Sequence, residues 1–66
     1  MDALERAALR SQYVAAQRLL GRLIEDKAKA TRRRDLAELG MLWSRITAQQ
    51  RHVAALAHRL FESPVD

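Results

Sequence analysis

The sequence predicts an all-α protein, a two-helix antiparallel hairpin with coiled-coil-like packing. The 66 residues are dominated by types that lose little side-chain freedom in a helix, and they include only two glycines and one proline. Apolar residues recur at helical spacing in two segments rather than alternating as in a strand. An acidic helix-start signal appears twice, at Asp2 and at Asp35. We therefore treat residues 1–66 as a single helical-hairpin domain.

The first helix is expected at about residues 3–30. Asp2 and Glu5 form an Asp-x-x-Glu pattern, in which the aspartate caps the helix and both acids suit the positive end of its dipole. One face of this helix carries an apolar stripe, which ends near Lys27. Its members are Leu9, Tyr13, Ala16, Leu20 and Leu23, broadened by Leu19 and Ile24. This width exceeds that of a two-stranded seam.

A turn is expected at residues 31–35. Three consecutive arginines, Arg32 to Arg34, precede Asp35, which repeats the Asp-x-x-Glu pattern with Glu38. Clustered like charges and a second cap signal favour a break over one continuous helix. A connection this short places the two helices antiparallel.

The second helix is expected at about residues 36–62. Its apolar residues recur every seven positions and are flanked by further apolar residues on both sides. The heptad positions are Leu39, Ile46, Val53 and Leu60, with Leu42 and Leu56 on one flank and Leu36, Trp43 and Ala57 on the other. The helix should end before Ser63-Pro64, because a residue that precedes proline avoids the helical region.

Two such wide stripes carry more apolar surface than one interhelical seam covers. A chain of this length also has a small core, and without cysteine it has no disulfide or thiolate metal site to stabilise it. We therefore expect a protein partner to complete the core, with either weak stability or self-association when the protein is alone. The residues expected to bind the partner are Leu36, Leu39, Trp43, Ile46, Tyr13 and Leu20.

The sequence contains no pattern that indicates an enzyme, and no catalytic, cofactor-binding or metal-binding residue is predicted. His52 and His58 are six residues apart, whereas a helical metal pair needs a spacing of three or four. The net charge is +4, and a basic cluster precedes Asp35. Because no aromatic residues are interleaved with that cluster, nucleic-acid binding is not expected.

No apolar stretch reaches the length of a membrane span, and the N-terminus lacks the apolar core of a signal peptide. The absence of cysteine fits a reducing compartment. These features together predict a cytoplasmic protein with no membrane partner.

The chain has 66 residues, opens with Met1-Asp2-Ala3-Leu4-Glu5, has a basic cluster at the expected tip, and carries Trp43 eight residues after Asp35. This combination gives the chain a resemblance to the small co-chaperones of type III secretion needle subunits (the YscE/EscE family). It implies a cytoplasmic helical hairpin that pairs with a tetratricopeptide-like chaperone and keeps the needle subunit unpolymerised. The chain differs from that family in having arginines rather than a glycine in the turn.

An alternative is a resemblance to the Rop-like RNA-binding regulators, in which two helical hairpins form a homodimeric four-helix bundle. Both alternatives predict helix and a partner. They differ in whether that partner is a second copy of the chain, and in whether RNA binds.

Overall fold

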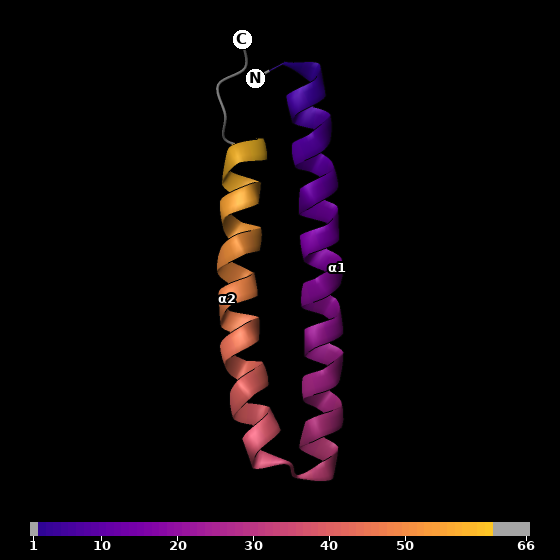
Figure 1. The fold of residues 1–66 in the computed structure, drawn as a ribbon, viewed down its shortest axis with the longest axis vertical. Coiled ribbons are helices and arrows are strands. Elements are labelled where there is room, and N and C mark those ends of the chain that lie inside the picture. The colour runs from indigo at the N-terminus through magenta and orange to yellow at the C-terminus, as the bar shows by residue number, and fades with distance from the viewer. Residues whose placement is uncertain (1, 62–66) are drawn as a thin grey trace.

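The computed structural model describes residues 2–61 and confirms the all-α helical hairpin. Helix α1 (Ala3–Arg33) and helix α2 (Leu36–Phe61) run antiparallel along their whole common length (Figure 1). The Cα atoms extend over 50 × 14 × 11 Å, so the hairpin is a single layer of helix. The predicted end of the second helix at residue 62 and its Ser63-Pro64 stop signal lie outside the described residues.

Both acidic caps form as the sequence predicted. The backbone N–H of Glu5 donates to Asp2 Oδ1 at 2.7 Å, and the backbone N–H of Glu38 donates to Asp35 Oδ1 at 3.1 Å. Each bond satisfies one of the N–H groups that a helix start leaves without an intrahelical acceptor. The caps therefore fix the first turn of each helix.

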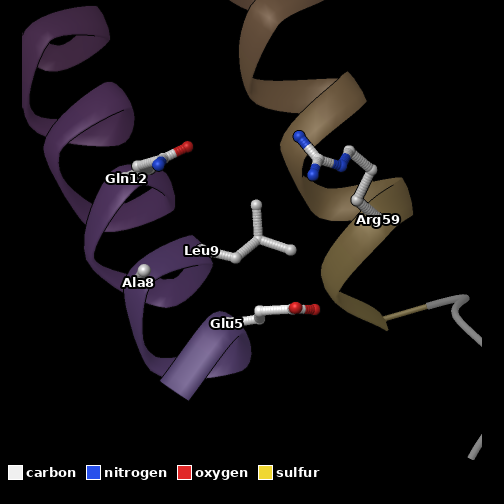
Figure 2. Close-up of a pocket in the computed structure, with 5 residues that line it drawn as sticks. All are labelled: Glu5, Ala8, Leu9, Gln12 and Arg59. Atoms are coloured by element: carbon white, nitrogen blue, oxygen red, sulfur yellow. The ribbon is translucent and has the colours of Figure 1, made fainter. Parts of the chain in front are cut away.

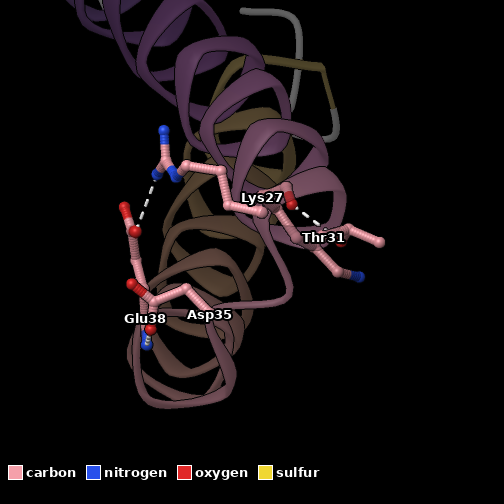
Figure 3. Close-up of polar contacts among 5 residues, drawn as sticks. Lys27, Thr31, Asp35 and Glu38 are labelled. Atoms are coloured by element: carbon pink, nitrogen blue, oxygen red, sulfur yellow. Dashed lines mark hydrogen bonds and ion pairs between the residues drawn. The ribbon is translucent and has the colours of Figure 1, made fainter.

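Helix α1 continues past the predicted residue 30 and ends at Arg33. Thr31 is accommodated because its hydroxyl donates to the Lys27 carbonyl at 2.8 Å (Figure 3). The chain then reverses at Arg34, whose φ of 57° and ψ of 35° are left-handed. The N–H groups of Arg34 and Asp35 donate to the carbonyls of Thr31 and Ala30, both at 3.1 Å. This is a Schellman arrangement, in which glycine usually occupies the left-handed position.

The core lies along the seam between the two helices. Its buried residues are Leu9, Ala16, Ala30, Leu42, Ile46, Leu56 and Leu60, and Tyr13 and Val53 pack against it while partly exposed. Six of these seven buried residues belong to the predicted apolar stripes, whereas Ala30 lies beyond Lys27, where the stripe of the first helix was expected to end. The core is small because two of its seven members are alanines, and such a core stabilises a hairpin only modestly.

Candidate partner-binding face

The structure divides the six residues that were expected to bind a partner. Leu36 and Trp43 are 80% and 62% exposed, values that are large for apolar side chains of this size. Tyr13, Leu20 and Leu39 are half-buried at the edge of the seam. Ile46 instead lies inside the seam, where the hairpin core uses it.

The exposed residues of this set lie on one long side of the hairpin, which we call the aromatic face. Side chains spaced by three or four residues line the same side of a helix. On α1 this series is Arg6, Arg10, Tyr13, Gln17, Leu20, Ile24, Lys27 and Thr31. On α2 it is Leu36, Leu39, Trp43, Thr47, Gln50, Ala54, Ala57 and Phe61. The rings of Tyr13 and Phe61 meet edge to face at 5.5 Å, so the two series border the same side of the seam.

Apolar surface on the aromatic face gathers in two patches. The first lies toward the turn, where Ile24 is 50% exposed and lies at a similar sequence distance from the turn as Trp43. The second lies at the open end of the hairpin, where Tyr13 packs on Phe61, which is 67% exposed. Polar residues separate the patches, among them Gln17, whose amide donates to the Tyr13 hydroxyl at 2.7 Å. A partner helix would therefore have two apolar contact points.

Ile24 and Phe61 also lie on the aromatic face, although they were not among the residues predicted to bind a partner. The sequence does contain a helical spacing that relates both residues to predicted apolar positions, because Ile24 follows Leu20 by four residues and Phe61 follows Ala57 by four. Helical spacing shows which residues share a flank of one helix. It does not show which flank of the other helix lies beside them on the same side of the hairpin.

The opposite long side, which we call the grooved face, has charged and apolar side chains and shallow depressions. One has a volume of about 430 Å³ and is lined by Glu5, Ala8, Leu9, Gln12 and Arg59, with Glu5 and Arg59 reaching over the seam from opposite helices (Figure 2). A smaller one of about 320 Å³ is lined by Leu19, Leu23, Arg45, Ala48 and Gln49. These depressions are open to solvent, unlike the enclosed pockets that bind small molecules.

The basic cluster lies at the tip of the hairpin and is partly used by the fold. Arg33 Nη2 donates to Glu38 Oε2 at 2.8 Å across the turn (Figure 3), and Arg34 is the left-handed turn residue. Because the Arg33 side chain is 60% exposed, this ion pair contributes at most about 1 kcal/mol. The cluster is adjacent to Leu36 in sequence but lies beyond the two apolar patches.

Within residues 2–61, no group of three or more His, Asp or Glu side chains is arranged to hold a metal ion. Over the same residues, neither helix has a stretch long and apolar enough to cross a membrane. Comparisons with protein-family models, with curated proteins and with solved structures gave no match. The residues of the chain therefore carry the functional argument.

Proposed function

We propose that this protein is a non-enzymatic co-chaperone that docks its aromatic face on a helical-repeat partner of the tetratricopeptide type. The observation that supports this proposal is the exposure of Trp43 and Leu36 on the same side of the hairpin. Tryptophan is enriched among the residues that dominate interface energies, and its exposed surface in the free hairpin is available for burial.

The exposed surface is continuous with apolar residues of the seam. Leu39 and Leu20 are half-buried on the same face as Trp43, so a partner seated there would complete their burial as well. A single-layer hairpin has no other element that could cover this side within the described residues. Such a module gains stability on binding, because a ligand that binds only the folded state stabilises it.

The finer proposal is that the pair keeps a type III secretion needle subunit unpolymerised in the cytoplasm. It is supported by the resemblance carried by the opening residues, the Asp35 cap and Trp43. A subunit designed to polymerise must be blocked before export. A hairpin with incomplete burial, held on a repeat chaperone, would supply part of the surface that blocks it.

The test is co-expression of the full chain with a tetratricopeptide-like needle chaperone, followed by co-purification and titration. Trp43→Ala should weaken the complex by roughly 30- to 1000-fold, the range typical of interface hot spots. The matched control is Met41→Ala, which removes a 49% exposed apolar side chain from the same helix on another side. Equal losses for both variants would contradict docking through the aromatic face.

The needle-subunit step has its own readout. Sedimentation of the needle subunit should show less polymer when both the chaperone and this hairpin are present than with the chaperone alone. If the hairpin binds the chaperone but leaves polymerisation unchanged, the co-chaperone role is wrong, while the docking face stands.

A further inference from the structure

The aromatic face carries positive charge without negative charge. Among residues 2–61, its charged members are Arg6, Arg10 and Lys27, all on α1, and no acidic side chain belongs to either of its series. Arg6 also donates to the carbonyl of Leu60 at 3.4 Å, so it is tied to the end of α2. Arg10 and Lys27 are exposed at opposite ends of the face.

The acidic residues of the two helices lie elsewhere. Glu5 lines a depression of the grooved face from α1, and Arg59 lines the same depression from α2 (Figure 2). Glu38 accepts a hydrogen bond from Arg33 at the tip. Glu25 and Asp26 fall outside the three-and-four series of the aromatic face. The charge asymmetry is thus a property of one face, beyond the net charge of the chain.

This asymmetry disfavours a second copy as the occupant of the face. An antiparallel two-fold pairing of two hairpins through this face would bring Lys27 of one copy near Arg10 of the other. A parallel two-fold pairing would seat α1 of one copy on α2 of the other, where the aromatic-face series of α2 offers Arg10 and Lys27 no acidic side chain. The antiparallel arrangement places like charges together, and the parallel one leaves the same cations without an acidic partner, so both are costly at an interface.

We infer that the aromatic face accepts one amphipathic helix whose apolar stripe is bordered by acidic side chains. The inference rests on the proposed docking function and specifies the chemistry of the partner. The apolar stripe would cover the Ile24–Trp43 patch and the Tyr13–Phe61 patch, and the acidic border would face Arg10 and Lys27. A helix that spans both patches needs about 18 residues, or roughly 27 Å, since α2 itself takes that length from Trp43 to Phe61.

The experiment uses two synthetic peptides of about 21 residues that lack tryptophan, a length set by the helical rise of 1.5 Å per residue. Both carry leucine at the a and d positions of three heptads, and they differ only in glutamate or lysine at the flanking e and g positions. Each is titrated into the full-length protein while the emission of its only tryptophan, Trp43, is recorded. The glutamate peptide should shift the emission to the blue and bind at least about tenfold more tightly at low salt, and the difference should shrink as salt screens exposed charges.

Two double variants with the same change in net charge provide the control. Arg10→Glu with Lys27→Glu should invert the preference, so that the lysine peptide binds more tightly. Arg18→Glu with Arg22→Glu changes α1 away from the aromatic face and should leave the preference unchanged. If both double variants alter the preference equally, net charge is responsible and the inference is overturned.

The remaining outcomes separate this inference from the proposed function. If both peptides shift the emission with equal affinity, the acidic border is wrong and docking on the aromatic face stands. If neither peptide shifts it, while the chaperone complex still depends on Trp43, the single-helix occupant is wrong. A dimeric mass for the free protein with Trp43 already buried would make a second copy the occupant and would overturn the inference.

Discussion

The side chain of Gln49 donates a hydrogen bond from Nε2 to the backbone carbonyl of Ala16 on the other helix, at 2.9 Å. Gln49 is half-buried and Ala16 is 6% exposed, so this polar contact lies inside the seam. The small side chain of Ala16 leaves room for the amide to reach the backbone of α1. A leucine at position 16 would occupy that room. This hydrogen bond therefore holds Gln49 of α2 beside Ala16 of α1 and helps to specify the register of the two helices.

Gln49→Ala should lower the free energy of unfolding by about 1 kcal/mol, the usual net value of one hydrogen bond. The matched control is Gln50→Ala, which has the same helix-propensity change at an exposed position and should alter stability by less than about 0.5 kcal/mol. Urea unfolding followed by circular dichroism measures both. Equal losses would mean that the Ala16 contact contributes nothing specific.

Arg34→Gly should stabilise the hairpin by up to about 1 kcal/mol. The left-handed conformation costs a residue with a Cβ roughly 1–2 kcal/mol, and glycine avoids this cost. Part of the gain is lost because glycine also makes the unfolded chain more flexible. The opposite sign is expected for Arg32→Gly, because position 32 is in the last turn of α1 and glycine there costs about 1 kcal/mol. Thermal unfolding of the two variants tests the contrast, and destabilisation by Arg34→Gly would contradict the turn geometry.

The triple variant Arg32→Ser, Arg33→Ser and Arg34→Ser should leave binding to a helical-repeat chaperone within about tenfold of the wild type. These side chains lie at the tip, and charges at the rim of an interface mainly tune association rates. Isothermal titration at two salt concentrations measures the effect. Loss of the complex in this variant would instead assign the basic cluster an electrostatic or nucleic-acid role.

Much of the fold could be predicted because it depends on short-range signals. The Asp2 and Asp35 caps are each decided within four residues, and the seam positions follow from the heptad spacing of Leu39, Ile46 and Leu60. The left-handed turn could not be predicted in the same way. No glycine or asparagine marks it, and Arg34 adopts that conformation because the helices must pack on each other.

The residues of the aromatic face were only partly predictable for a related reason. Both flanks of each stripe are apolar, so the sequence does not tell Leu42, which the hairpin buries, from Trp43, which it exposes. Contacts between the helices make that distinction. The contact between the Tyr13 and Phe61 rings shows that the flank of α1 with Tyr13 and the flank of α2 with Phe61 lie on the same side of the hairpin.

The last prediction concerns the neighbours Leu42 and Trp43, which are 3% and 62% exposed. Leu42→Ala should destabilise the fold by about 2–5 kcal/mol, because it removes core volume from a small seam. A loss of that size is enough to unfold a marginal hairpin, since whole domains are stable by only about 5–15 kcal/mol. Trp43→Ala should change the free energy of unfolding by no more than about 0.5 kcal/mol, because an exposed side chain away from special features contributes little.

Far-ultraviolet circular dichroism during urea unfolding separates the two variants, and fluorescence provides a second measurement. In the free protein, Trp43 should emit as an exposed indole and be readily quenched by iodide. If Trp43→Ala instead destabilises the hairpin as strongly as Leu42→Ala, the indole is part of the core. The surface that binds a partner would then have to lie on α1, with Leu20 and Ile24 as the residues to truncate next.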